Sequence, residues 1–251
     1  MNMKMKWMVR FSNDGVAYGD FRWNPIGQWT EAPDWNDAPE CGGGLHGQGE
    51  GGWGYTQSGS RFELCEIDKV VIVENDKVKT NRARIVAVDN KAWSMLVELC
   101  GGHFKGSLDL SSYNQPLPKG LKSVGGYLSL SRYNHPLPEG FKNVEGSLSL
   151  HGYNHPLPEG LKNMGGSLDL REYNHPLPKG LKSIGGSLFL ENYNHPMPGK
   201  FKSVGGSLYL YGYNHPLPEK FKSVGSYLDL RGYNHPLPEG LKNWTRWGGG
   251  K

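Results

Sequence analysis

The chain has 251 residues, among them 37 glycines and 17 prolines, and a mild net charge of +4. This length suits one large or two modest domains; no apolar run approaches the ~18–20 residues that a membrane-spanning helix needs, so we expect a soluble protein with no membrane partner. The charge is unevenly placed, since residues 1–100 carry 11 basic and 14 acidic side chains whereas residues 101–251 carry 17 and 10.

Residues 1–89 are predicted to form a small, mainly β domain. Short runs of β-branched and aromatic residues are separated by Asn-Asp-Gly and Pro/Gly turns. The predicted strands are Met5–Phe11, Val16–Trp23, Arg61–Glu66, Val70–Val73 and Ala83–Val88. A long glycine-rich loop, Trp29–Ser60, lies between the second and third strands, and a loop of that length inside a compact domain is commonly functional.

Three motifs in this region resemble a small domain of unknown function found in phage and bacterial proteins. After an aromatic and glycine-rich start come CGGGLH at Cys41–His46, RFELCEI at Arg61–Ile67 and DKVKTNRARIV at Asp76–Val86. The resemblance covers roughly Met5–Val88. It implies no known activity.

The same region contains the weak metal-ligand candidates Cys41, His46 and Cys65, with His103 as a distant fourth. No paired Cys-x-x-Cys frames them, so we expect no metal and no cofactor. The glycine stretch also lacks the Gly-Lys-Ser/Thr of a phosphate loop. A Gly-Leu-His turn before a strand is faintly similar to ADP-ribosyltransferase-like folds, which leaves an ADP-ribosyltransferase-like or metal-binding N-terminal domain as an alternative.

The cysteines and the first residues bear on location. Cys41, Cys65 and Cys100 are an odd number, and Met1–Arg10 has lysines but no apolar stretch of the kind found in signal peptides. We therefore expect a reducing, cytoplasmic setting, which is the bacterial host cytoplasm if the chain is phage-encoded.

Residues 90–103 are predicted to be a capping helix and linker. Asn90 is a suitable N-cap for a helix that ends near Cys100. Its apolar residues, Trp93, Leu96, Val97 and Leu99, are expected to seat on the first repeat and cover its exposed strand edge.

A twenty-residue unit repeats across residues 104–244. Its Tyr-Asn pair recurs without insertion at Tyr113, Tyr133, Tyr153, Tyr173, Tyr193, Tyr213 and Tyr233. Self-similarity at a fixed period of this size is the signature of a solenoid. In each unit two leucines, such as Leu128 and Leu130, alternate with variable residues, so we expect the leucines to point inward and successive coils to stack about 4.8 Å apart.

The segment LPEGLKNMGGSLDL at Leu157–Leu170 resembles the short leucine-rich repeats of bacteria and bacteriophages. The resemblance implies a right-handed solenoid with one parallel sheet, of a kind that usually binds partners. The bulkier Tyr-Asn-His-Pro segment departs from that family's turn. The expected fold is thus mainly β: a small β (α+β) domain, then a right-handed solenoid of seven 20-residue repeats with one parallel sheet, then a tail at residues 245–251.

Two polar columns follow from the repeat. The histidines from His135 to His235 occupy one turn position, where we expect the imidazole to bond the neighbouring coil rather than a metal, because parallel side chains do not converge. The lysine column is either a solvated flank or an anion-binding track. Its members are Lys122, Lys142, Lys162, Lys182, Lys202, Lys222 and Lys242.

The outward strand positions differ between copies, and they are the predicted protein-binding site. Aromatic residues together with arginine are typical of interface hot spots. The predicted site comprises His151, Asp169, Arg171, Phe189, Glu191, Tyr209, Tyr211, Asp229 and Arg231.

No nucleophile elbow, zinc-protease helix or kinase motif is visible, so the sequence favours a non-enzymatic protein-binding module. The resemblances point to a phage or bacterial protein that engages a host or defence-related protein. The alternative partner is a nucleic acid or another anionic ligand on the lysine column.

Overall fold

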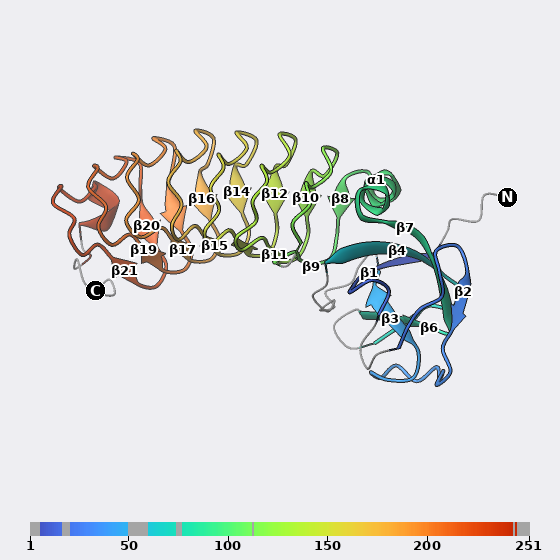
Figure 1. Ribbon diagram of the computed structural model, residues 1–251. Helices are drawn as coiled ribbons and strands as arrows, with labels where there is room; N and C mark the ends of the chain where they lie inside the picture. The colour runs from blue at the N-terminus through green and yellow to red at the C-terminus, as the bar shows by residue number, and fades with distance from the viewer. Residues whose placement is uncertain are drawn as a thin grey trace. The chain divides into compact units, whose positions relative to one another are not determined.

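The computed structural model describes residues 6–16, 21–49, 60–73, 77–111, 113–242 and 244. The chain forms two compact units, Met1–Gly126 and Tyr127–Lys251, which are described separately (Figure 1). The first coil of the repeat array therefore belongs to the same unit as the N-terminal domain.

The N-terminal unit contains an antiparallel sheet with the strand order β2-β7-β4-β1-β3-β6-β5. Its strands are β1 (Trp7–Ser12), β2 (Trp29–Glu31), β3 (Leu45–Gln48), β4 (Arg61–Ile67), β5 (Val71–Ile72), β6 (Lys77–Thr80) and β7 (Arg82–Val88). The predicted mainly β character is confirmed.

Two predicted segments of this unit differ from the observed structure. The expected loop Trp29–Ser60 contains β2 and β3, because β2 pairs with β7 and β3 with β6. Of the expected strand Val16–Trp23, residues 17–20 lie outside the described ranges, and Val16 forms only isolated bridges to Asn13 and Arg22.

The single α-helix in the described ranges, α1, spans Asp89–Cys100. The predicted N-cap, Asn90, is wrong: the N-cap is Val88, and Asp89 has a positive φ of 46°. The Asp89 carboxylate is used elsewhere, since its Oδ1 accepts a hydrogen bond from the Phe62 N–H at 3.0 Å. Gly101, in the left-handed conformation, ends the helix as expected of a C-terminal glycine.

The helix packs on the first coil through aromatic side chains. Trp93 is buried and stacks on Phe62 with ring centroids 4.0 Å apart. The Trp93 ring also packs edge to face with the ring of Tyr113, the first tyrosine of the repeat, and their centroids are 6.1 Å apart. This coil comprises β8 (His103–Phe104), β9 (Leu108–Asp109) and β10 (Ser123–Val124), and β8 pairs with β10 in parallel.

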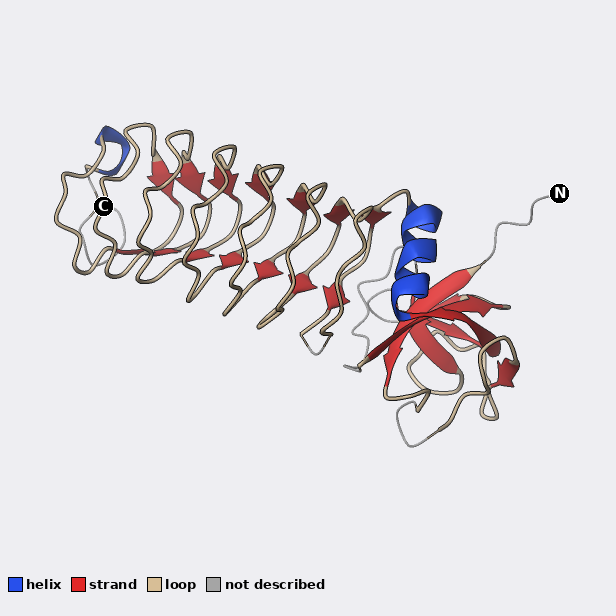
Figure 2. Cartoon of the chain, turned by 45° about the horizontal axis from the view of Figure 1, so that its top comes forward, coloured by secondary structure: helices blue, strands red, loops and turns tan. Residues whose placement is uncertain are grey.

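The second unit is a parallel β-solenoid whose coils place two rows of short strands in register (Figure 2). One row comprises β11 (Leu128–Ser129), β13 (Leu148–Ser149), β15 (Leu168–Asp169), β17 (Leu188–Phe189), β19 (Leu208–Tyr209) and β21 (Leu228–Asp229). The other comprises β12 (Asn143–Val144), β14 (Asn163–Met164), β16 (Ser183–Ile184), β18 (Ser203–Val204) and β20 (Ser223–Val224). The array ends in a 3-10 helix, η3 (Glu239–Leu241).

The solenoid itself is confirmed, but the strands form two parallel sheets where the sequence predicted one. The Ser/Asn-Val pair of each coil hydrogen-bonds to the equivalent pair twenty residues later, as in Ser183 with Ser203 and Ile184 with Val204. In most coils this pair is followed by glycine and not by a second apolar residue, as in Ser183-Ile184-Gly185, so it shows no alternation from which a strand could be predicted.

The interior consists of stacked identical side chains, as the leucine spacing predicted. Leu128 and Leu130 are fully buried, and so are their equivalents in the later coils. Between the two strand rows, glycines allow coils to approach closely: a Cβ added at Gly185 would lie 2.1 Å from the Gly165 carbonyl oxygen.

Tyrosine and histidine side chains form hydrogen bonds with backbone groups of the preceding coil. The backbone N–H of Leu157 donates to the Tyr173 hydroxyl at 3.0 Å. Equivalent bonds join Leu137 to Tyr153, Leu177 to Tyr193, Met197 to Tyr213 and Leu217 to Tyr233. Nε2 of His175 lies 3.2 Å from the Asn154 carbonyl oxygen, an arrangement repeated by the next three histidines. These four histidines thus bond the neighbouring coil, as expected. Nε2 of His155 does not follow the pattern, because it is buried without a hydrogen-bond partner.

Candidate functional site

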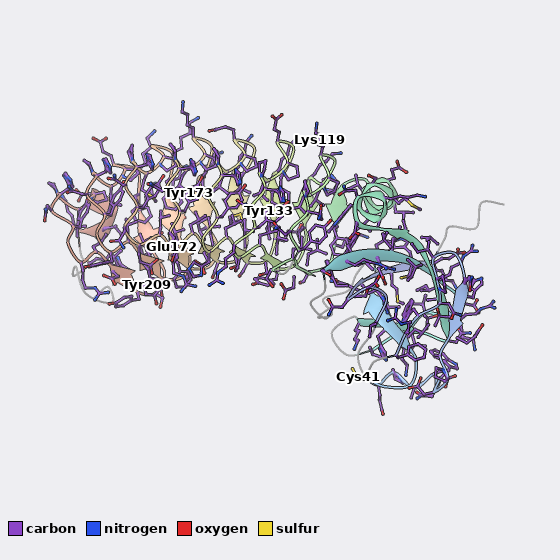
Figure 3. The ribbon with its side chains drawn as sticks, viewed as in Figure 1. Cys41, Lys119, Tyr133, Glu172, Tyr173 and Tyr209 are labelled. Carbon is purple, nitrogen blue, oxygen red and sulfur yellow. The ribbon has the colours of Figure 1, made fainter. Side chains whose placement is uncertain are left out.

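The outer face of the β11–β21 row holds two aspartates and two aromatic residues in register. Asp169 lies opposite Phe189, Phe189 opposite Tyr209, and Tyr209 opposite Asp229. Tyr209 is labelled in Figure 3, in the part of the array that contains β19 and β21. Because parallel strands repeat every twenty residues, this order in space is the order of the coils.

The aromatic side chains on this face form a continuous stack. The planes of the Phe189 and Tyr209 rings are nearly parallel, at an angle of 5°, and the ring centroids are 4.8 Å apart. The Arg171 guanidinium lies 5.8 Å from the centroid of Phe189, and the Tyr227 ring lies 5.8 Å from that of Tyr209. The two central rings therefore cover one face of each other, Arg171 lies over Phe189, and Tyr227 packs against Tyr209 at a tilt of 43°.

Tyr227 is a member of this surface that the sequence reasoning missed. Its column holds Ser147, Ser167, Ser187 and Ser207, whose hydroxyls accept the backbone N–H of the next coil. Tyr227 is 36% exposed and Tyr211 is 45% exposed. The alternation that points Asp229 outward also points Tyr227 outward, so this signal was available. We call Phe189, Tyr209, Tyr211 and Tyr227 the aromatic patch.

Two bidentate ion pairs bracket the patch. Asp169 accepts from Arg171 at 2.6 and 3.0 Å, and Asp229 accepts from Arg231 at 2.7 and 2.9 Å. Arg231 also lies over the Tyr211 ring, 5.1 Å from its centroid. Each aspartate holds its arginine in a fixed orientation beside an aromatic ring.

The ion pairs affect the acidity of both aspartates. Hydrogen bonds from the Arg231 side chain lower the pKa of Asp229, and they outweigh the effect of burial. Burial alone would raise the pKa of Asp169, but the hydrogen bonds and charge of Arg171 bring it below its ordinary value. Both carboxylates are therefore charged at neutral pH.

The remaining predicted residues differ in accessibility. His151 Nε2 lies 3.4 Å from Glu172, and His151 and Glu191 are partly buried. Asp229 is only 4% exposed, so the prediction that it contacts a partner is corrected: the bidentate contact with Arg231 covers its carboxylate. The other eight predicted residues are partly or fully accessible.

The lysines of the predicted column are all exposed. In the first unit, Lys122 Nζ donates to the Gly101 carbonyl at 3.3 Å. In the second unit, Lys242 is paired with Glu239. The backbone N–H of Lys182 donates to Lys162 O at 2.9 Å, and that of Lys202 donates to Lys182 O at 2.7 Å, which places these side chains in register.

The weak metal candidates are not brought together. Cys41 is exposed, Cys65 is buried in β4, and His46 is on β3. Within the described ranges, no group of three or more His, Cys, Asp or Glu is placed to hold a metal ion. Burial, and then the charges of Lys77 and Lys79, lower the pKa of His46 to about 4, while burial raises the pKa of the Cys65 thiol.

A buried lysine, not anticipated from the sequence, fixes the start of the glycine-rich segment. Lys79 is fully buried, and its Nζ donates to Asn36 Oδ1 at 3.0 Å and to the carbonyls of Glu40 and Gly42 at 3.2 and 3.1 Å. Three acceptors satisfy the three donors of the ammonium group. Lys79 therefore has a structural role.

Over the described ranges, no helix combines the length and apolar character required to cross a membrane. No protein-family model, curated protein or solved structure matches the chain.

Proposed function

We propose that this chain is a non-enzymatic protein-binding module whose contact surface is the aromatic patch with Arg171 and Arg231. The observation that carries the proposal is the stack of Phe189 on Tyr209, which is partly exposed on a rigid sheet. Aromatic and arginine side chains dominate the binding energy of protein interfaces.

The fixed geometry favours binding. The sheet backbone holds Phe189 and Tyr209 in register, and the ion pairs immobilise both arginines. Side chains ordered before binding lose little conformational entropy when a partner arrives. The surface can therefore contribute contact area at a small entropic cost.

The same geometry disfavours stacking of nucleic-acid bases. Single-stranded nucleic acids bind by laying bases on open aromatic faces. Here the faces of Phe189 and Tyr209 are covered by each other, by Arg171 and by Tyr227. A protein surface that packs against ring edges suits the patch better.

The resemblances of the repeat and of the N-terminal region add a biological setting. They suggest a phage or bacterial protein that acts on a host or defence-related protein in the cytoplasm. In this setting the solenoid supplies the contact surface.

The test is a co-purification from bacterial lysate with matched variants. Phe189→Ser with Tyr209→Ser removes the stack at outward positions, and Ser183→Ala with Ser203→Ala changes the other strand row at equivalent depth. The proposal is supported if a partner is retained by the wild type and by the Ser183→Ala, Ser203→Ala control but is lost by the Phe189→Ser, Tyr209→Ser variant. Equal retention by all three excludes the patch, provided that circular dichroism shows all three folded.

A further inference from the structure

A second surface of the solenoid, independent of the aromatic patch, is formed by the lysine ridge, which we define as Lys142, Lys162, Lys182, Lys202 and Lys222. All five are exposed. In the part of the chain that the structure describes, none of their side chains makes an ion pair, in contrast to Lys242 with Glu239.

The charge of the ridge is concentrated at one end. Residues 139–162 contain two lysines and three glutamates, whereas residues 179–222 contain six lysines and two glutamates. One of those two, Glu191, follows the strand β17 beside the aromatic patch, which leaves Glu219 near the ridge. The ridge is thus nearly neutral in its early coils and strongly basic in its later ones.

The excess arises at a position where the other coils have glycine. A Cβ at Gly160 would lie 3.4 Å from the Lys142 side chain, and one at Gly180 would lie 3.4 Å from that of Lys162. The equivalent residues two coils later are Lys200 and Lys220, both exposed. By the twenty-residue register, Lys200 stands beside Lys182 and Lys220 beside Lys202, so ammonium groups of like charge are gathered together.

Gathering like charges destabilises the free protein and is relieved by an anionic partner. The ridge repeats about every 4.8 Å. The phosphates of duplex DNA repeat at about 3.4 Å per strand, whereas acidic residues on one face of an α-helix recur once per turn, about every 5.4 Å. The flexible four-carbon stem of lysine can absorb the smaller mismatch with a helix over four coils.

The neighbouring strand residues also bear on the partner. The residues that follow the last three ridge lysines carry hydroxyl groups: Ser183, Ser203 and Ser223. The aromatic residues that precede ridge lysines, Phe141, Phe201 and Phe221, are fully buried, so they offer no ring to a ligand on the ridge. Base stacking on aromatic rings is the common mode of single-strand binding. Hydroxyl and ammonium groups donate hydrogen bonds to anionic oxygens, carboxylates included, and do not need base stacking.

We propose that the basic end of the lysine ridge, from Lys179 to Lys222, binds a helical protein segment that carries a stripe of Asp or Glu on one face. The segment lies along the solenoid axis, with successive carboxylates at successive coils. This binding is electrostatic, so it weakens with salt.

The test uses two labelled alanine-based peptides of roughly 20 residues, long enough to be helical in water. One carries its glutamates at alternating spacings of three and four residues, which places them on one face; the other has the same composition with the glutamates spread around the helix. Fluorescence anisotropy at low and physiological salt is expected to show about tenfold tighter binding of the striped peptide, a difference of ~1.4 kcal/mol.

Charge-swap variants locate the site. Lys182→Glu with Lys202→Glu should weaken striped-peptide binding by about tenfold or more, whereas the matched control, Lys142→Glu with Lys162→Glu, should have a smaller effect because Glu139 and Glu159 lie beside those lysines. Phe189→Ser with Tyr209→Ser should leave it unchanged, which separates this site from the aromatic patch. Equal binding of both peptides, no measurable binding, equal loss in both charge-swap variants, or tighter binding of a duplex DNA would overturn the proposal.

Discussion

The Leu157 backbone N–H donates to the hydroxyl of Tyr173, sixteen residues later and in the next coil, at 3.0 Å. The hydroxyl thus satisfies a buried donor that no strand pairs, and the phenol ring fills the interior beside it. The tyrosine column is for this reason part of the scaffold and not of the proposed binding surface.

Removing one such hydroxyl should destabilise the solenoid. Tyr173→Phe keeps the ring but leaves the Leu157 N–H buried without its acceptor, which costs about 1–3 kcal/mol. Urea unfolding followed by circular dichroism measures the loss. Tyr211→Phe is the matched control, because that tyrosine is exposed, and its unfolding midpoint should not move. Equal midpoints for the two variants would show that the hydroxyl bond contributes nothing.

The same phenols predict a loss of stability in alkali. Burial, opposed in part by the backbone hydrogen bond, raises the pKa of Tyr153, Tyr173 and Tyr213 from 10 to about 12. The unfolded chain releases these protons first, so the stability they provide is complete below pH 10 and is lost as the pH rises toward 12. Tyrosinate absorbance and circular dichroism should therefore change together over this interval. Ionisation of all the tyrosines near pH 10 in a folded chain would contradict the prediction.

Two glycines of the same coil should respond differently to an added methyl group. A Cβ at Gly185 would meet the Gly165 carbonyl oxygen at 2.1 Å, whereas a Cβ at Gly199 meets nothing within 4 Å. Gly185→Ala should force the two coils apart and cost about 1–3 kcal/mol by overpacking. Gly199→Ala should be neutral or slightly stabilising. The comparison of urea midpoints is decisive, and similar midpoints would refute the close approach.

A strained position offers a stabilising change. Arg132 has φ of +60° at a turn where Gly152 has +71° and Gly212 has +75°. The left-handed conformation is costly for a residue with a Cβ, so Arg132→Gly should raise stability by roughly 0.5–1 kcal/mol. Arg132→Ala retains the strain and serves as control. If alanine stabilises as much as glycine, the gain comes from loss of the arginine side chain instead.

The repeat period was sufficient to predict the architecture of the second unit. Identical spacing fixed the register, and the alternation around Leu188 and Leu190 placed Phe189 outward, where the structure has it. The mainly β character of the first unit followed from composition. These features depend on local patterns that a sequence displays directly.

Other features depend on contacts that the sequence does not display. The burial of Asp229 results from how Arg231 folds back over its carboxylate. Asn90 lies inside α1 because the helix already begins at Asp89, whose carboxylate accepts a hydrogen bond from the backbone N–H of Phe62, a residue distant in the chain. The second strand row was not predicted because pairs such as Ser183-Ile184 are followed by glycine, whereas the first row continues as Leu188-Phe189-Leu190 and so shows an alternation.

The backbone pairing between coils has a consequence for how such a chain can change. Strand pairs such as Leu188 with Leu208 hydrogen-bond through main-chain atoms, and their side chains pack inward. Substitutions at the neighbouring outward sites therefore leave the scaffold intact, and duplication of a whole coil preserves every bond between neighbours. The outward side chains can thus be substituted one coil at a time during evolution, and the array can be lengthened, without changing the scaffold that carries the proposed binding surface.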